Sequence, residues 1–380
     1  MNITSKKSDN ELVITLTGAL DLTTATLFDN ELLLEGIDRL VLDFAHCHHV
    51  SSAGLRVLLR AHKSMSTGDR KMNLINVSRD VHGIFDLTGL TKILAIKQKM
   101  REISIEGLQM ISEGVCGECF QLDKETVVKL YREGVEPIVA ENEKQYAKAA
   151  FVMGIPTAIS YDVVSCGTRT GIVFEMLNAE LFSHVIKKDF ANVDKHAKTL
   201  SDLAKTLHVA KGDPAILPNM KESFRGYIRK MDDFLSPEEV DFLMQKLESI
   251  PDCDTCVHFD LHSSNIMIQN GEPVIIDMGD LSIGSYLFDV GLVFAIYGVE
   301  ELGLSMRATK LPVAQGLELW SKFHEHFFAD KSEQERAFFH ENRYFLGSLR
   351  FVCAANFLPK MRGEFVPMIK NVFIPKMMGK

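Results

Sequence analysis

Two polar segments in the second half of the chain bring carboxylates and an amide close together along the sequence. Residues 258–265 have the form HxDxxxxN, and Asp277-Met278-Gly279 follows after a short apolar run. Transfer of a phosphoryl group to a hydroxyl needs a carboxylate that orients and accepts the hydroxyl proton, and oxygen ligands that hold Mg²⁺ on the nucleotide phosphates. Asp260 suits the first task. Asn265 and Asp277 suit the second, because Mg²⁺ prefers oxygen ligands.

Four residues upstream would complete such a site, and they occur in the order that it requires. Lys129 lies in a β-type run from which its ammonium can reach the α- and β-phosphates of a nucleotide. Glu143, on the next predicted helix, can hold that ammonium, while Gly114 and Gly117 open the sheet. A lone GxxG is weak evidence. The combined order of glycines, Lys, Glu, HxDxxxxN and DxG is far more specific.

The elements that must position these residues follow from apolar runs and helical spacing. A hairpin-like pair of strands is predicted around a polar turn, followed by a helix and then by a buried strand, at 111–122, 126–131, 139–153 and 171–176. Beyond these the chain is mostly helical, with helices predicted at 193–207, 237–247 and 333–346.

The first hundred residues alternate strands with helices. Strands are predicted at 12–16, 40–44 and 72–77, and helices at 24–33 and 53–65. This β-α-β-α order predicts a small α/β domain. A short charged segment, Lys99-Met100-Arg101-Glu102, separates it from the second series of strands. We therefore place the domain boundary near residue 105.

Length and composition agree with two folded domains. A chain of 380 residues with 46% hydrophobic and 24% charged residues is too long for one small core and too apolar for extended disorder. The longest apolar stretch, Tyr286 to Val299, is interrupted by Asp289 and is shorter than the roughly 20 residues of a membrane span. The N-terminus lacks the apolar core of a secretory signal. We expect a cytoplasmic protein with no membrane partner.

The distribution of charge argues against nucleic acid as a partner. The formal net charge is -9, and residues 1–105 carry about 13 basic and about 12 acidic groups, which leaves the negative charge on the remainder. Proteins that bind nucleic acid normally present a basic face to the phosphates. Neither half of this chain is basic.

Two CxxC pairs, Cys116 with Cys119 and Cys253 with Cys256, stand out among the seven cysteines. Paired CxxC motifs can hold zinc or form a redox bridge. Here they lie at the glycine turn and just before HxDxxxxN. The alternative is reduced thiols, because an odd number of cysteines spread over a long chain is a poor disulfide framework.

From its combined motifs, the segment 106–380 resembles the aminoglycoside phosphotransferase and choline kinase family, a branch of the protein-kinase-like fold. The helix end Leu203 to His208 and the acidic Asp289 are also similar to the family pattern. The resemblance implies two lobes, about 106–177 and about 178–380, with ATP and Mg²⁺ as cofactors. It also implies an adenine hinge over Phe174 to Leu177, so that Glu175 and Met176 would contact the nucleotide.

The chain departs from this family at two points. Ser263-Ser264 replaces the usual Pro-Gly pair, and Met278 replaces an aromatic residue after the metal-binding Asp. Neither change removes a charged group. The segment 181–249, which would select an acceptor, has no acidic cluster that would suit a cationic drug, so the acceptor stays open.

The segment Val50-Ser51-Ser52-Ala53-Gly54-Leu55 lies between a predicted strand and helix, which places Ser52 at a helix N-cap. A phosphate there would meet free backbone N–H groups and the positive end of the helix dipole. Together with Gly18 to Ala25, this segment resembles the STAS domain of bacterial anti-sigma factor antagonists. In the family pattern Asp-Ser-Ser/Thr-Gly the first Ser is the phosphoacceptor, which corresponds to Ser52. Ser51 takes the place of the Asp, and Ala53 that of the second hydroxyl.

These observations predict a two-domain protein of α/β and α+β class, in which a STAS-type α/β domain (1–105) precedes a two-lobed kinase-like domain (106–380). The predicted function is ATP- and Mg²⁺-dependent phosphotransfer to a hydroxyl of a small molecule or protein, with the STAS domain contacting a partner such as an anti-sigma factor-type serine kinase. One alternative is a non-catalytic, nucleotide-sensing pseudokinase scaffold that acts as an antagonist through the STAS domain. In a hybrid of the two, the kinase-like half phosphorylates Ser52.

Overall fold

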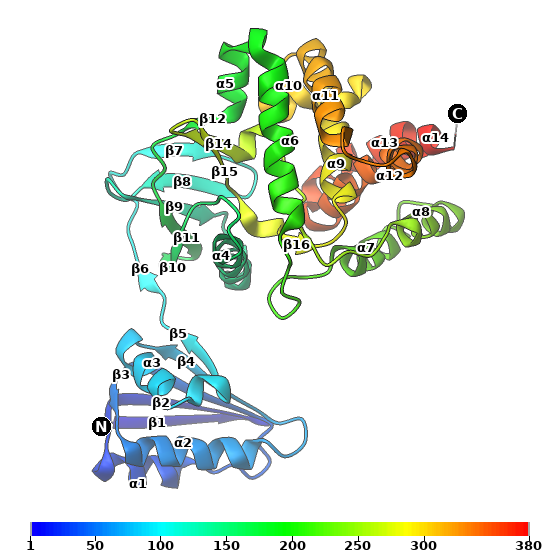
Figure 1. The fold of residues 1–380 in the computed structure, drawn as a ribbon. Coiled ribbons are helices and arrows are strands. Elements are labelled where there is room, and N and C mark those ends of the chain that lie inside the picture. Colours follow the sequence, from blue (N-terminus) through cyan, green and yellow to red (C-terminus); the bar gives the residue numbers. More distant parts are fainter. Residues whose placement is uncertain (1, 379–380) are drawn as a thin grey trace. The chain divides into compact units, whose positions relative to one another are not determined.

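The computed structural model describes residues 2–378 and divides the chain into two compact units, Met1–Glu102 and Ile103–Lys380 (Figure 1). The smaller unit is one sheet with helices packed on it. The larger unit begins with a sheet and continues mainly as helices. Among the described residues, no helix is both long and apolar enough to span a membrane.

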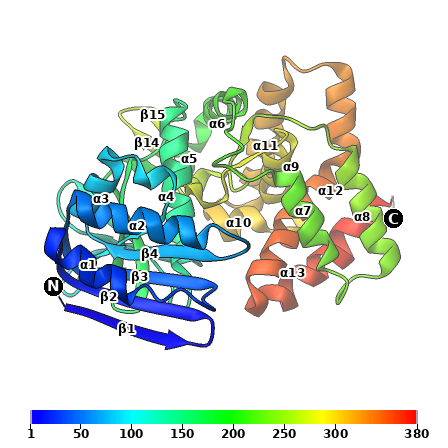
Figure 2. The ribbon, with the colours of Figure 1, turned by 90° about the horizontal axis from the view of Figure 1, so that it is seen from below.

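The sheet of the smaller unit has the strand order β1-β2-β3-β4-β5. β1 and β2 pair antiparallel, and every other neighbouring pair is parallel, with a helix or longer crossover between its strands. Helices α1 and α2 lie side by side (Figures 1 and 2). The elements are β1 (Asn2–Ser8), β2 (Glu11–Leu20), α1 (Leu22–Glu31), β3 (Arg39–Val50), α2 (Ser52–Met65), β4 (Lys71–Val77), α3 (Arg79–Leu87) and β5 (Ala95–Gln98).

The core of this unit follows from strand alternation. Ile14 and Leu16 of β2, and Leu40 and Leu42 of β3, are all fully buried because they share one face of the sheet. The three predicted strands and two predicted helices are all present. β1, α3 and β5 are additional: β1 is an edge strand whose residues are mostly polar and exposed, so it has no alternating apolar pattern.

The start of α2 corrects one prediction. Ser51, not Ser52, is the N-cap residue, and Ser52 is the first residue of the helix. The backbone N–H of Ser51 donates to Leu20 O at 2.9 Å, which fixes the chain as it leaves β3. Gly54 allows the close packing of this helix on β2, because a Cβ there would lie 2.6 Å from Leu20 Cγ.

The larger unit opens with a six-stranded sheet of order β6-β10-β11-β9-β8-β7. The predicted strand 111–122 is in fact two strands, because the chain turns at Gly114, whose N–H donates to Gly117 O at 2.8 Å. The elements are β6 (Arg101–Glu102), which the contacts assign to the end of the smaller unit, β7 (Met110–Glu113), β8 (Gly117–Gln121), β9 (Thr126–Tyr131), α4 (Pro137–Val152), β10 (Ser160–Cys166) and β11 (Arg169–Glu175).

The remainder of the larger unit is a helical body with two small sheets, β12-β14-β15 and β13-β16. Its strands are β12 (Glu180–Leu181), β13 (Cys256–Val257), β14 (Ile266–Gln269), β15 (Glu272–Ile275) and β16 (Ser282–Ile283). Its α-helices are α5 (Phe182–Lys188), α6 (Val193–Val209), α7 (Met220–Arg229), α8 (Pro237–Ser249), α9 (Leu287–Val293), α10 (Leu304–Thr309), α11 (Val313–Phe328), α12 (Glu333–Phe357), α13 (Arg362–Met368) and α14 (Ile374–Met377).

Helix α12 extends well beyond the predicted 333–346. Its second half, from Gly347 to Ala355, is buried at most positions. A helix that is buried nearly all round loses the amphipathic spacing on which sequence prediction depends. Aromatic side chains fill the core beside it, and Phe224, for example, stacks on Phe288 with ring centroids 5.8 Å apart.

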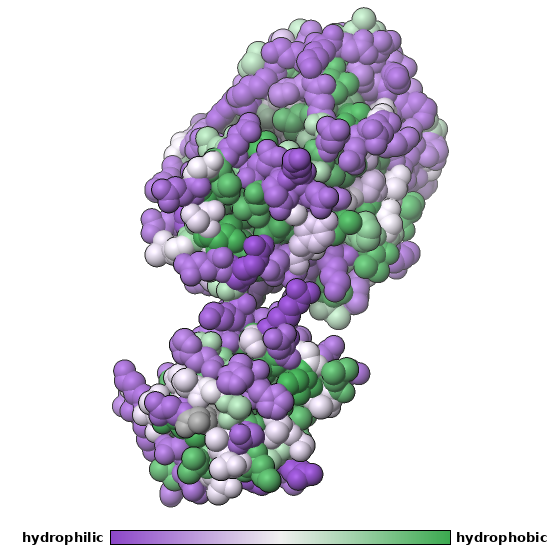
Figure 3. Space-filling view, turned by 90° about the vertical axis from the view of Figure 1, so that its left-hand side faces the viewer, coloured by the Kyte–Doolittle hydropathy of each residue, from purple (hydrophilic) through white to green (hydrophobic). Residues whose placement is uncertain are grey.

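Figure 3 shows hydrophobic residues gathered among hydrophilic ones on the side of the larger unit that carries the six-stranded sheet. Met110, Ile111 and Val115, around the turn from β7 to β8, are exposed apolar residues of this region.

Candidate active site

The loop between β13 and β14 carries the HxDxxxxN segment, and Asp289 anchors it. Asp289 lies on α9, is fully buried, and accepts hydrogen bonds from the backbone N–H groups of His258 at 3.0 Å and Phe259 at 2.6 Å. Its Oδ2 also lies 2.8 Å from His208 Nε2 on α6. A carboxylate with three such partners rigidly fixes the loop. Phe259 has a φ of 60°, a left-handed conformation that this anchoring sustains.

Asp260 and Asn265 face each other across this loop. The amide Nδ2 of Asn265 donates to Asp260 Oδ2 at 3.0 Å and to Asp260 O at 2.9 Å. The carbonyl oxygen of the Asn265 side chain is therefore turned away from Asp260 and is available as a ligand. Burial raises the pKa of Asp260, but the neighbouring Arg350 and other positive groups outweigh it, so that the pKa lies below its usual range.

Backbone hydrogen bonds place Asp277 next to this loop. The N–H of Ile276 donates to Asn265 O at 2.9 Å, and His258 Nε2 lies 3.2 Å from Ile276 O. Asp277 follows with a φ of 65°, again in the left-handed region. Its side chain is half-exposed, at 44%. The carboxylates of Asp260 and Asp277 thus lie on adjacent segments that are held together by main-chain contacts.

Lys129 connects the sheet to the segment that carries Asp277. Its Nζ lies 2.9 and 2.8 Å from the two carboxylate oxygens of Glu143 and 2.8 Å from Asp277 Oδ1. Glu143 is 2% exposed and also accepts from the hydroxyl of Tyr131. Burial lowers the pKa of Lys129, but the carboxylates of Glu143 and Asp277 outweigh it, so that the pKa is raised and the ammonium stays charged.

The two glycines of the β7–β8 turn have different constraints. Gly117 is buried against β9, where a Cβ would lie 2.4 Å from Leu130 O, so no side chain fits. Gly114 has open space around it, with a Cβ meeting only Gly117 O at 3.9 Å. Arg132 holds the turn by donating to Glu113 Oε1 at 2.6 Å and to Gly114 O at 3.0 Å.

The predicted hinge residues already have partners within the fold. The backbone N–H of Met176 donates to Glu125 O at 2.7 Å, and the Glu175 side chain accepts from Ile159 N at 2.8 Å. These contacts fix the strand end at the boundary between the sheet and the helical body. The backbone N–H of Met176 is therefore already paired within the fold.

One residue of the site lies outside every sequence motif. Arg350, on α12, places Nη2 at 3.1 Å from Asp260 Oδ2 and Nη1 at 2.5 Å from Asp280 Oδ2. Its guanidinium also lies over the Phe259 ring, 5.5 Å from the centroid. The predicted helix 333–346 ends before this position, and no sequence motif includes Arg350, so its role was not predicted.

The cysteine pairs do not build a metal centre in the described part of the chain. All seven cysteines are free thiols, and no group of three or more His, Cys, Asp or Glu side chains within residues 2–378 is arranged to hold a metal ion. Burial raises the pKa of Cys116 and of Cys119. A raised pKa favours the protonated thiol over the thiolate at neutral pH.

In the smaller unit the predicted phosphoacceptor, Ser52, is exposed at the first turn of α2. Its neighbour Ser51 makes no side-chain cap, and its Oγ is buried without a hydrogen-bond partner among residues 2–378. Asp21, at the start of α1, caps that helix by accepting from Thr24 N at 3.0 Å.

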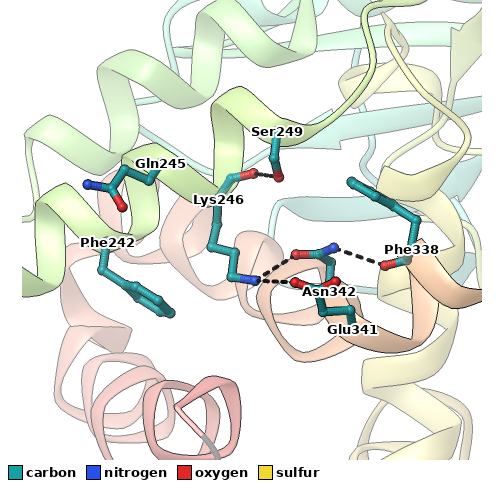
Figure 4. Close-up of a pocket in the computed structure, with 7 residues that line it drawn as sticks. All are labelled: Phe242, Gln245, Lys246, Ser249, Phe338, Glu341 and Asn342. Atoms are coloured by element: carbon teal, nitrogen blue, oxygen red, sulfur yellow. Dashed lines mark hydrogen bonds and ion pairs between the residues drawn. The ribbon is translucent and has the colours of Figure 1, made fainter.

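A pocket of about 270 Å³ lies apart from these residues, between α8 and α12 (Figure 4). Lys246 crosses it and contacts Asn342 Oδ1 at 3.0 Å and Glu341 Oε1 at 3.4 Å. Phe242 and Phe338 form its apolar walls. It contains none of the residues that the sequence predicted for a site.

Comparison with known families gives two matches that follow one another along the chain. Residues 2–103 match the STAS domain, and residues 118–326 match the phosphotransferase enzyme family. The Bordetella bronchiseptica protein BtrV, described as an anti-sigma factor antagonist, is 29% identical over 99 residues, which are 25% of this chain and 85% of that protein.

Among solved structures, the ternary complex of APH(2″)-IIa with streptomycin and ATP is 15% identical, with a TM-score of 0.47, and covers 72% of this chain and 90% of that one. An ethanolamine kinase of Plasmodium vivax is 15% identical, with a TM-score of 0.46, and the match covers 64% of this chain and 73% of that one. The family models confirm the predicted fold class, in which a STAS-type α/β domain precedes a kinase-like domain.

Proposed function

We propose, because the chain belongs to the phosphotransferase enzyme family, that its larger unit transfers the γ-phosphoryl group of ATP to an acceptor hydroxyl, with Mg²⁺ as the metal. The observation that carries this proposal is the convergence of charged and polar side chains from the sheet, α4, the HxDxxxxN loop and the following turn. These residues are Lys129, Glu143, Asp260, Asn265 and Asp277.

The free oxygens of the site fit the metal. Asn265 directs its amide nitrogen to Asp260, and Asp277 uses Oδ1 to accept from Lys129, so that Asn265 Oδ1 and Asp277 Oδ2 remain as ligands. Bound Mg·ATP supplies the phosphoryl group and a metal that neutralises charge on the phosphates. Lys129 provides a fixed positive charge beside the Asp277 carboxylate, and Glu143 holds it there.

Asp260 is the residue that we propose to act on the acceptor. Its Oδ2 is taken by Asn265 and Arg350, whereas Oδ1 lies 3.7 Å from His262 Nε2, which is longer than a hydrogen bond. Oδ1 is therefore the atom that accepts the proton of the acceptor hydroxyl. The low pKa of Asp260 keeps it ionised, so that it is ready to orient that hydroxyl.

The smaller unit supplies regulation or a partner contact in this proposal. Its STAS domain and the likeness to BtrV support an interaction with an anti-sigma factor-type serine kinase, and the exposed Ser52 is the candidate phosphoacceptor. The acceptor of the larger unit is then a small molecule, another protein, or Ser52 itself.

The test is to incubate the purified chain with Mg·ATP and to measure both ADP release and the intact mass, with mapping of any modified peptide. Asp260→Ala should abolish both signals. Asp254→Ala is the matched control, because Asp254 is an exposed aspartate that pairs with Lys211 outside the site. We expect it to leave both signals unchanged.

The outcomes separate the alternatives. A phosphate on Ser52 that depends on Asp260 would show that the chain carries both the kinase and its acceptor. ADP release without modification of the chain points to a separate acceptor and to metabolite screens. If ADP binds but is never produced, the larger unit is a nucleotide-sensing scaffold and the proposal is wrong.

A further inference from the structure

The surroundings of Asp260 include a partly buried cation to which the reaction scheme above assigns no task of its own. Arg350 comes from α12, far along the chain from the HxDxxxxN loop, and its side chain is 27% exposed. A guanidinium that is largely withdrawn from water needs anionic partners, because an unpaired charge there is costly. It has two of them, Asp260 and Asp280, with one terminal nitrogen on each.

The geometry points to Arg350 as a positioning residue for phosphoryl transfer, and this inference rests on the proposed function. Arg350 and Asn265 both engage Asp260 Oδ2, at 3.1 and 3.0 Å. A hydrogen bond from Asn265 and an ion pair with Arg350 on the same oxygen fix the rotation of the carboxylate. They leave Oδ1 directed to the acceptor hydroxyl, while Asn265 keeps its own oxygen for the metal.

Arg350 also ties two catalytic segments to each other. Asp280 lies three residues after Asp277, in the short 3₁₀ turn Met278–Asp280 that begins directly after the proposed metal ligand. By bridging Asp260 and Asp280, one guanidinium sets the spacing between the base and the metal turn. The planar fork of arginine can hold two carboxylates in fixed directions, which the single ammonium of lysine cannot do.

A merely structural clamp predicts a different outcome from a positioning residue. Loss of a clamp would weaken folding and nucleotide binding together. Loss of positioning would slow the transfer step but leave the nucleotide site intact. That site is built on Lys129, Glu143 and the β7–β8 turn. The KM for ATP and kcat therefore separate the two readings.

The test compares Arg350→Gln and Arg350→Lys with the wild-type chain in steady-state ADP release from Mg·ATP. For Arg350→Gln we expect kcat to fall by about 100-fold, as misplacement of a reacting group by about 1 Å does, while the KM for ATP changes less than about twofold. Arg350→Lys should fold and recover only part of kcat, because it restores the charge but not the bridge.

Arg343→Gln is the matched control on the same helix. Its guanidinium lies 5.0 Å from the Tyr344 ring centroid and 5.8 Å from that of Phe294, and it contacts neither Asp260 nor Asp280 in the described residues. We expect kcat to stay within about twofold of the wild type.

The kcat and the KM for ATP of the wild type and of the two Arg350 variants decide between the outcomes. If wild type releases ADP and Arg350→Lys matches its kcat, the inference is wrong and the proposed function stands. The same holds if Arg350→Gln folds and raises the KM for ATP at unchanged kcat. If Arg350→Gln fails to fold, the kcat of Arg350→Lys decides alone. If the wild-type chain never turns over ATP, the proposed function fails and the inference fails with it.

Discussion

The two regions that carry candidate phosphate chemistry are built in opposite ways. In the larger unit each proposed functional side chain is held by others: Lys129 has two carboxylate partners, and Asp260 Oδ2 has a hydrogen bond from Asn265 and an ion pair with Arg350. At the start of α2 in the smaller unit, Ser52 is exposed, and the Oγ of Ser51 is buried without a partner in the described chain.

This difference indicates two kinds of function. A preorganised set of charges suits catalysis, because its groups do not have to rearrange when charge moves in the reaction. An exposed serine at a helix start suits modification, because a phosphate can be added there without disturbing any existing contact. Substitutions should therefore have large effects in the first region and small ones in the second.

The largest effect should come from Lys129→Met. Removal of the ammonium leaves Glu143, which is 2% exposed, beside Asp277 without a counter-ion. The loss of one partner of a buried ion pair costs about 3–5 kcal/mol of the free energy of unfolding. We expect the affinity for ADP to fall by at least about tenfold and unfolding in urea to occur at a clearly lower concentration. Isothermal titration with Mg·ADP and urea unfolding measure the two effects.

Lys221→Met gives the matched control for this prediction. Lys221 is also a buried lysine of the larger unit, but it donates to the carbonyl of Ile250 at 2.8 Å and contacts Asp252 at 3.1 Å, away from the site. It should lower stability and leave the affinity for ADP unchanged. Equal loss of affinity in both variants would mean that Lys129 acts only through folding.

Asp289→Ala should loosen the HxDxxxxN loop by removing the carboxylate that anchors it. Asp289 is fully buried and accepts hydrogen bonds from the backbone N–H groups of His258 and Phe259. Its loss leaves these two donors, as well as His208, without their partner. Each stranded buried donor costs about 1–3 kcal/mol. We expect the free energy of unfolding to fall by several kcal/mol and amide hydrogens of residues 257–265 to exchange faster. Unchanged exchange in this loop would contradict the anchoring role.

The sequence predicted the parts of the site that lie within short motifs. Asp260, Asn265 and Asp277 stand at fixed spacing on one loop and the following turn, so local pattern was enough to bring them together. Arg350 comes from a helix that is buried nearly all round, and its contacts exist only in the folded chain. No single-sequence signal marks such a residue. The N-cap of α2 was misplaced by one residue, because Ser51 and Ser52 are equally suitable caps by type.

The stability of the larger unit should depend on pH through His324. Burial, and then the neighbouring His340 and the arginines Arg336 and Arg343, lower the pKa of His324 on α11. Near pH 6.5 the His324 side chain therefore binds a proton in the unfolded chain but not in the folded one. The free energy of unfolding falls as the pH drops through that value. Trp320, the one tryptophan, lies 5.6 Å from the His324 ring and reports unfolding of this unit by fluorescence.

The variant His324→Gln sharpens this prediction. It removes the titrating group, so the decrease in urea midpoint between pH 8 and pH 5.5 should be smaller than in the wild-type chain. An identical decrease in both proteins would mean that other groups carry the acid sensitivity of the larger unit.

The smallest effect should come from Ser52→Asp. Ser52 is exposed at the first helical position, and a negative charge at a helix N-terminus stabilises the helix by about 0.3–1 kcal/mol. Amide hydrogens of α2 should therefore exchange more slowly, by up to about fivefold. Ser66→Asp, at the C-cap of the same helix, is the matched control and should have the opposite sign, because the charge meets the negative end of the dipole. Faster exchange of the α2 amide hydrogens in Ser52→Asp would mean that a negative charge at this position disrupts the helix start. The smaller unit would then respond to phosphorylation by local unfolding and not by a change of surface charge alone.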